Sequence, residues 1–381
     1  MLEPVVAFFQ RIAYLIGRPF VAAGRWFSAR RWVVKGPIAV IALAIVIGYG
    51  YFIVQTQSWT NFNPDYVDAY RLSEQTVDAG TTLPATAAPA PSTSSAETGT
   101  TTAAPAQPAA QTCQRSAIVN VTAGLIDFNV DENAWVSSML LYKLGLFGID
   151  WDHTPFLDNK ASFQRGVNQA IRRTTVELVD SLGRMRGTSG INTNLQAARG
   201  NMQFDEESWY FGLNPFGPKT PSPSYYRAAA RDLRLFDNTL ASCAAIFDAR
   251  ADNLVEFIDR ITSDIGDTSS ILRERSELHS AGWFDTRADD RFWFAYGQLY
   301  GYYGILSAAR ADFQTVIQQR NIGPLYTETL KQLRAALRIQ PLIISNGAED
   351  GWIMPNHLST MGFYILRARS NLVEMRDVLA R

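Results

Sequence analysis

The longest apolar run in the chain lies at residues 32–54. No side chain between Gly36 and Val54 is charged. A helix over residues 32–54 would span roughly 34 Å, which exceeds the roughly 30 Å hydrocarbon core of a bilayer. Trp32 lies at one end of the run, and Tyr51 and Trp59 lie near the other, where aromatic residues favour the membrane interface. The pattern predicts one transmembrane helix.

Residues 1–31 combine bulky apolar side chains with arginines. Arg11, Arg18 and Arg25 recur every seven residues, so they would share one face of a helix. This pattern predicts an amphipathic helix in the membrane interface, with these arginines contacting anionic lipid headgroups. Pro19 should kink or split that helix. The alternative is a basic tail that only orients insertion.

Two segments of different composition follow the span. Residues 55–79 carry Trp59, Phe62, Tyr66 and Tyr70, which predicts a short juxtamembrane segment that could lie as a helix on the outer leaflet. Residues 80–112 are rich in Pro, Ala and Thr and hold one charge and no aromatic residue. They lack the apolar area needed to offset the entropy of ordering, which predicts a disordered linker that lets the next domain stand off the membrane.

Residues 113–381 show helical periodicity almost throughout. The spacing from Leu254 to Leu272 predicts a seam of two helices interrupted by Gly266, and no alternating pattern predicts strands. We therefore predict an all-α domain, an antiparallel bundle of six to eight helices that follows the single N-terminal transmembrane helix. The other expected helices cover residues 132–147, 161–186, 225–247, 289–320, 325–337 and 357–379.

Charge changes this picture by assigning an orientation. The net charge is only −1, yet the six basic residues up to Lys35 face a single acid, Glu3. Between the span and Thr112, acids outnumber the one base, Arg71. The positive-inside rule then predicts a cytoplasmic N-terminus and, in a bacterium, a periplasmic main domain anchored in the inner membrane. A cleaved signal is the alternative, but the run is longer than a typical signal core and no small-x-small site follows it closely.

The chain has two cysteines, Cys113 and Cys243, both on the exported side of the predicted span. An oxidising compartment permits them to pair. A bridge would close a loop of about 130 residues, worth at most roughly 4–5 kcal/mol in the chain-entropy model. The alternative is a buried thiol at Cys243 and a mobile one at Cys113.

Several short motifs occur in order along the predicted bundle. They are FDEESW at residues 204–209, SYYR at 224–227, ARADNL at 249–254, the aromatic helix at 289–321, NG at 346–347, PNHL at 355–358 and RARSN at 367–371. Together they resemble the bacterial family called domain of unknown function 2333, single-span envelope proteins. The resemblance covers roughly residues 120–380 and the anchor. It implies an envelope location and a mostly helical domain, and it supplies no catalytic residues.

Acidic residues cluster where the aromatic helix begins. Asp285, Asp289 and Asp290 could cap that helix, because carboxylates complement its exposed amides and the positive end of its dipole. A pair of acids one turn apart could instead act as general acid and base in glycan cleavage. His357, with Glu349 or Asp350, is a further candidate base, and entry into a helix behind Pro355 is the plainer interpretation.

The same helix carries aromatic residues around almost its whole circumference, together with Gly297, Gly301 and Gly304. The glycines would let another helix approach closely. Aromatic residues on every side indicate either burial or one side open to a groove for a lipid tail, a glycan or a partner helix. The candidate groove residues are Trp293, Tyr296, Tyr300 and Tyr303.

Other kinds of site find less support. Arg165, Arg172 and Arg173 share roughly one face and could bind phosphate or carboxylate groups, although internal ion pairs are the default interpretation. The three histidines lack the spacing of a zinc site, and no CxxC or HExxH motif occurs, so we expect no metal and no cofactor. Nucleic acid is an improbable partner because the exported domain has balanced charge.

Taken together, these patterns predict a membrane-anchored periplasmic domain that binds or scaffolds other envelope components and is not an enzyme. Expected partners are membrane lipids, through the anchor and the basic segment, and other envelope proteins. The alternatives are an envelope glycan or lipid hydrolase or lyase that uses acidic residues, and a lipid-binding protein.

Overall fold

The structure is a computed structural model that describes residues 3–83, 111–146, 148–154, 157–184, 190–213, 215–279, 282, 285–348 and 354–381. The chain divides into two compact units, Met1–Val54 and Gln55–Arg381. We describe each unit by itself.

The first unit consists of α1 (Glu3–Ser28) and most of α2 (Trp32–Gln57). The helix is not split at Pro19, and α1 continues through that residue as one helix. Proline removes one backbone hydrogen-bond donor, and the other backbone hydrogen bonds of this 26-residue helix maintain it despite that loss. Helix α2 is long and apolar enough to cross a membrane, as expected, and it extends three residues beyond Val54.

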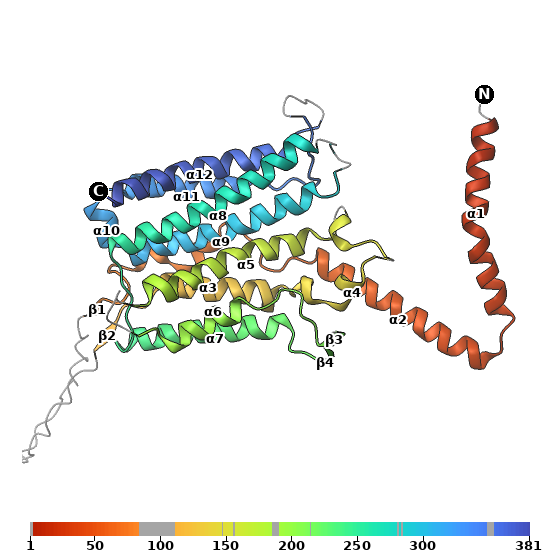
Figure 1. The fold of residues 1–381 in the computed structure, drawn as a ribbon, viewed down its shortest axis with the longest axis horizontal. Coiled ribbons are helices and arrows are strands. Elements are labelled where there is room, and N and C mark those ends of the chain that lie inside the picture. The colour runs from red at the N-terminus through yellow and green to blue at the C-terminus, as the bar shows by residue number, and fades with distance from the viewer. Residues whose placement is uncertain are drawn as a thin grey trace, which may run out of the picture. The chain divides into compact units, whose positions relative to one another are not determined.

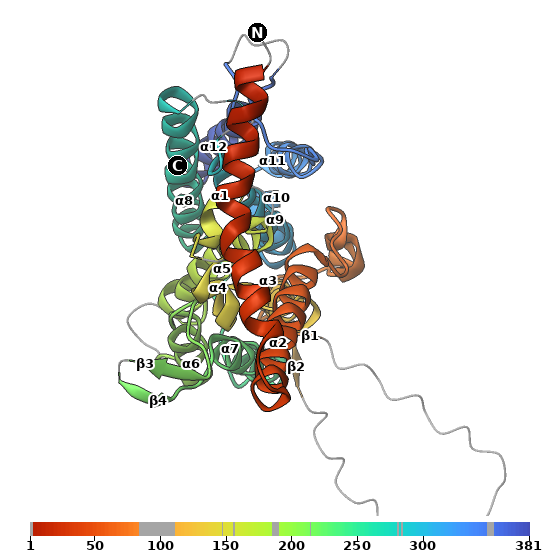
Figure 2. The same cartoon turned by 90° about the vertical axis from the view of Figure 1, so that its right-hand side faces the viewer.

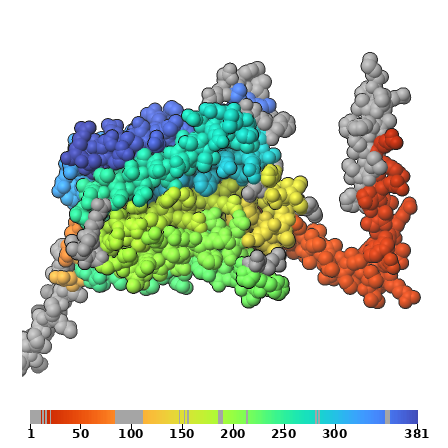
Figure 3. Space-filling model, viewed as in Figure 1, coloured from red at the N-terminus to blue at the C-terminus, as the bar shows by residue number. Residues whose placement is uncertain are grey.

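The second unit is all-α with two small two-stranded sheets, which confirms the predicted fold class (Figure 1). In Figure 1, α8, α11 and α12 form an upper layer, α5 and α9 a middle layer, and α3, α6 and α7 a lower layer. The space-filling view shows these layers in continuous contact (Figure 3). The helices are α3 (Ala117–Asp127), α4 (Leu140–Leu144), α5 (Asn159–Glu177), α6 (Thr193–Met202), α7 (Ser222–Ala241), α8 (Ala251–Leu278), α9 (Ala288–Asp312), α10 (Gln314–Gln319), α11 (Gly323–Ala336) and α12 (His357–Leu379).

Helix α9 is the centre of this unit. Twenty of its 25 residues are buried, and it contacts α3, α5, α8, α11 and α12. A helix that is apolar around its whole circumference must be covered on all sides, which explains its central place. It packs closest to α5, because a Cβ at Gly297 or Gly166 would overlap backbone of the facing helix. The contacts Phe163 to Gly297 and Ala170 to Gly301 show that α5 and α9 run in the same direction.

Several elements differ from the expected ones. The helix expected at residues 132–147 is instead a π-helical turn (Phe128–Glu132), a 3-10 turn (Val136–Ser138) and the short α4. Helix α8 is not interrupted at Gly266, where the missing side chain makes room for Arg369 of α12. The helix expected at residues 289–320 breaks at Phe313, and a second π-helical turn (Leu178–Leu182) ends α5. Helix α6 and the hairpin of β3 (Phe211–Leu213) and β4 (Phe216–Pro218) were not expected.

The Pro/Ala/Thr-rich segment does not connect the span to the bundle. Residues 84–110, most of the expected linker, lie outside the described residues. The flanking strands β1 (Thr82–Leu83) and β2 (Thr112–Cys113) pair antiparallel, so Thr82 lies opposite Cys113. The segment therefore leaves and returns at one place on the bundle. A spacer between membrane and domain needs its two ends on different bodies, so the expected spacer role is wrong.

The tight contact between α5 and α9 gives a stability prediction. Gly297→Ala should destabilise the protein by about 2–3 kcal/mol, because the new methyl group overlaps the Phe163 carbonyl and forces the helices apart. Gly362→Ala is the matched control, since a Cβ there meets nothing within 4 Å and alanine should stabilise α12 by up to about 1 kcal/mol. Urea unfolding followed by circular dichroism measures both. Equal stability of the two variants would contradict the packing described.

Candidate functional site

The C-terminal end of α2 is held by a buried cation. Lys160, in the first turn of α5, donates hydrogen bonds from Nζ to the carbonyl oxygens of Gln55 (3.0 Å) and Ser58 (2.7 Å). These are carbonyls that the end of a helix leaves without partners, and the positive charge also complements the helix dipole. Burial lowers the pKa of Lys160 to about 8, so the side chain stays mostly charged at neutral pH.

Residues 55–79, which we call the junction segment, belong to the bundle rather than forming a separate juxtamembrane segment. The side chain of Asn133 receives a hydrogen bond from the Thr60 amide (2.9 Å) and donates one to the Thr60 carbonyl (2.9 Å). Farther along, Gln75 donates to Asp312 (3.0 Å). The junction segment thus runs beside α9 from its beginning to its end.

Aromatic side chains of the junction segment cover the face of α9 that was expected to form a ligand groove. The ring of Trp59 lies 5.3 Å from Trp293, and the ring of Tyr66 stacks on Tyr300 at 4.3 Å. The Tyr66 hydroxyl donates to the Tyr300 carbonyl (2.7 Å), and the Tyr300 hydroxyl donates to the Asn63 carbonyl (3.1 Å). The segment that was expected to lie on the leaflet therefore occupies this face.

The four groove candidates consequently form part of the core. Tyr296, Tyr300 and Tyr303 are buried and Trp293 is half-buried. The Tyr296 hydroxyl donates to the Leu337 carbonyl, and burial raises the pKa of all three tyrosines. Tyr300 also lines a cleft of about 450 Å³ between the junction segment and α3, together with Phe62, Tyr70 and Phe128.

A larger groove of about 920 Å³ lies farther along the same side, between the junction segment and α9, α10 and α11. Its apolar lining includes Val67, Leu72 and Ile317. Two exposed arginines, Arg71 and Arg310, also line it, and Arg310 has no ion-pair partner within the described residues. The groove can therefore accept a ligand that is partly apolar and carries negative charge.

The three acidic candidates at the start of α9 have different surroundings. Asp285 pairs with Arg275 and accepts a hydrogen bond from Asn346 (2.8 Å). Burial acts to raise its pKa, yet the bonds from Arg275 and Asn346 hold that pKa below its ordinary value. Asp290 accepts from the Ser162 hydroxyl (2.8 Å), beside a cleft of only about 120 Å³. These two carboxylates fasten the helix start to its neighbours.

Asp289 is the chemically unusual group at this place. Both of its carboxylate oxygens are buried, and neither makes a hydrogen bond of good geometry within the described residues. Burial and the neighbouring Asp290 raise the pKa of Asp289 from 3.8 to about 8, against a partial lowering by the backbone amides of the first turn. The carboxyl is thus mostly protonated at neutral pH. Its side chain does not line the cleft beside Asp290.

His357 begins α12, and its Nδ1 accepts a hydrogen bond from the Ser345 amide (2.9 Å). Burial lowers its pKa, and the bond to Ser345 offsets this only in part. The neutral ring therefore serves the entry into the helix. Glu349 and Asp350, its expected partners, lie outside the described residues.

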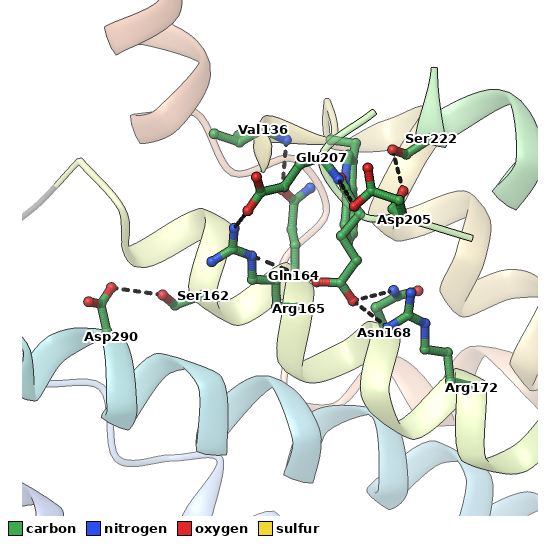
Figure 4. Close-up of polar contacts among 12 residues, drawn as sticks. Val136, Ser162, Gln164, Arg165, Asn168, Arg172, Asp205, Glu207, Ser222 and Asp290 are labelled. Atoms are coloured by element: carbon green, nitrogen blue, oxygen red, sulfur yellow. Dashed lines mark hydrogen bonds and ion pairs between the residues drawn. The ribbon is translucent and has the colours of Figure 1, made fainter. Parts of the chain in front are cut away.

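The arginine face of α5 binds the chain's own acids (Figure 4). Arg165 pairs with Glu207 (2.9 Å), and Arg172 pairs with Glu206 (2.9 Å) and donates to the Met202 carbonyl (2.7 Å). These contacts hold residues 204–209 against α5. Arg173 pairs with Asp264 (3.3 Å), a buried carboxylate that also accepts from Gln298 and Tyr302 of α9.

Cys113 and Cys243 form a disulfide bond that joins β2 to the end of α7. No group of three or more potential metal-ligating side chains occurs among the described residues. Arg11, Arg18 and Arg25 lie on α1, where they are exposed or partly exposed. Sequence reasoning missed Lys160, Asn133 and Asp312, because single polar residues within an apolar helical pattern carry no signal of the backbone they will meet.

The state of Asp289 gives a pH prediction. In the native state the Asp289 carboxyl keeps its proton up to about pH 8, whereas in the unfolded state it releases the proton near pH 4. The free energy of unfolding should therefore fall as the pH rises from about 4 to 8, by an amount on the order of 5 kcal/mol. Asp289→Asn should remove most of this slope and make the variant the more stable protein at pH 8. Asp252→Asn, at an exposed position, controls for the loss of one carboxylate. Urea unfolding between pH 4 and 8.5 measures the slope, and parallel profiles for Asp289→Asn and the wild type would contradict the prediction.

Comparisons with known proteins agree with the motifs found in the sequence. No curated protein and no solved structure matches this chain. The family DUF2333, described as uncharacterized protein conserved in bacteria, matches residues 104–281 and 273–381. These two matches cover most of the chain, including every helix from α3 to α12. The chain therefore belongs to the bacterial family DUF2333.

Proposed function

We propose that this protein is a single-pass inner-membrane protein whose helical domain lies in the periplasm and acts as a scaffold or binding module of the cell envelope. The excess of basic residues before α2 supports a cytoplasmic N-terminus. The disulfide between Cys113 and Cys243 supports an oxidising compartment for the bundle, since such bonds persist there and are rare in the cytosol.

The junction between the span and the bundle is the observation that carries this proposal. Val54 is bonded directly to Gln55, whose carbonyl is already held by Lys160. No long spacer intervenes, so the bundle begins within a few residues of the end of the span. Such a short attachment suits a protein that positions a partner close to the membrane.

The groove beside Arg310 is the proposed site for an envelope protein. Its volume of about 920 Å³, its apolar lining and its free cation suit an acidic segment with apolar side chains. The alternative, an envelope hydrolase or lyase that uses acidic residues, finds less support, because Asp289 is only 5% exposed and Asp285 forms an ion pair with Arg275. We further propose that Arg11, Arg18 and Arg25 contact anionic lipids at the cytoplasmic face.

Orientation can be tested with reporters. Alkaline phosphatase fused after Arg381 should be active and green fluorescent protein fused there should be dark, because the first folds only in the periplasm and the second only in the cytoplasm. Fusions truncated before α2, after residue 31, should give the opposite pair. A fluorescent fusion after Arg381 would reject the periplasmic location and the envelope role with it.

The partner proposal predicts co-purification. Full-length protein isolated in mild detergent at native expression should carry a protein partner that mass spectrometry identifies. Arg310→Glu should reduce the recovered partner by at least about 10-fold, because it reverses the free charge in the groove. Arg320→Glu, an exposed arginine outside the groove, is the matched control and should have no effect. Isolation of a wild-type monomer without any protein partner would refute the binding role.

A further inference from the structure

Exposed apolar side chains gather at the end of the bundle that receives α2. We call this the junction end; it contains Lys160 and the first turns of α5 and α9, which run in the same direction. Figure 2 looks toward it and shows α4, β3 and β4 there. The large exposed apolar groups on or beside these elements are Leu140, Leu144, Ile149, Tyr210, Phe211 and Phe216.

Arg165 connects these elements to one another. It lies over the ring of Tyr142 in α4 (5.4 Å) and pairs with Glu207, four residues before β3 (2.9 Å). The hairpin rings Phe211 and Phe216 contact each other edge to face at 4.9 Å. The α4 turn and the hairpin thus lie near each other and both expose apolar side chains at the junction end.

The loops on the opposite side of the junction end add to the patch. Leu278 ends α8, just before α9 begins, and Leu342 and Ile343 lie between α11 and α12. The bridge between Gly282 and Asn346 ties these two loops together. Leu342 is 94% exposed, the highest value among the large apolar residues of the bundle that the structure describes.

This distribution is uneven. Fifteen large apolar residues of the described bundle are exposed, and nine of them lie at the junction end. The other six are spread over α7, α8, α12 and two loops. Single exposed apolar residues are normal on protein surfaces, but a concentration at one end indicates a surface that contacts something apolar.

The covalent chain identifies what that surface meets. The last apolar residue of the span, Val54, precedes by one peptide bond the carbonyl that Lys160 holds. Whatever the angle at this joint, the junction end starts within a few residues of the membrane. Aromatic side chains favour the membrane interface, and Lys143 and Lys219, exposed on α4 and beside the hairpin, can reach anionic headgroups.

We propose that the junction end rests in the outer leaflet of the inner membrane, with the β3–β4 hairpin and the α4 turn inserted among the lipid headgroups. This inference rests on the proposed function, because it requires α2 to span the membrane. Arg310 lies 17 residues after Trp293 on α9, about 25 Å along the helix axis, so the groove lies at a distance from the junction end.

Site-directed spin labelling tests the contact. Full-length Phe216→Cys is labelled with a nitroxide and reconstituted into nanodiscs of phosphatidylethanolamine and phosphatidylglycerol, and its accessibility to oxygen and to a water-soluble nickel chelate is measured. Leu235→Cys is the matched control, since this side chain is 51% exposed on α7, well along the helix from the junction end. Ala44→Cys, within the span, reports on anchoring itself. The native cysteines are paired and take no label.

Lipid contact predicts that oxygen accessibility exceeds nickel accessibility at Phe216 and at Ala44, and that nickel accessibility exceeds oxygen accessibility at Leu235. If Ala44 gives the lipid signature but Phe216 behaves like Leu235, the contact is refuted and the anchor stands. If Ala44 also behaves as water-exposed, the anchor and the contact both fall. Should Phe216→Cys fail to fold, Leu144→Cys on α4, 58% exposed, supports or refutes the same contact.

Discussion

The hydrogen bonds from Lys160 to the end of α2 are the constraint on which the rest of the arrangement depends. A buried ammonium is costly unless its charge is well solvated by the protein, and here two carbonyls at a helix end provide that solvation. The bond fixes where the chain enters the bundle. From Gln55 onward, the aromatic residues of the junction segment pack on α9.

A second buried charge fastens the other end of the junction segment. Asp312, at the end of α9, is fully buried and accepts hydrogen bonds from the Ser116 hydroxyl, the amides of Ala117 and Ile118, and Gln75. Burial raises the pKa of Asp312 to about 6 despite these donors. The anion thus lies at the N-terminus of α3 as the cation lies at the C-terminus of α2, and each complements the dipole of the helix it meets.

Much of the fold could be predicted from the sequence because the strongest patterns are local. The expected boundaries of α12 agree with the structure, and the apolar circumference of α9 indicated burial before its neighbours were known. The junction segment could not be assigned, since Trp59, Phe62 and Tyr66 suit a membrane interface and a protein core equally well. The choice between these surroundings depends on Lys160 and Asn133, more than 70 residues away in sequence.

Other errors have the same origin. Residues 132–147 have helical periodicity, but Asn133 has an extended backbone and its side chain bonds with Thr60, so a regular helix does not continue through that residue. Gly266 reads as a helix breaker, yet it is the point where α12 needs space for Arg369. In both cases a long-range contact outweighs local propensity. The chemistry of Asp289 belongs to the same class, because its spacing from Asp285 and Asp290 is visible in the sequence whereas its burial, the largest cause of its raised pKa, is not.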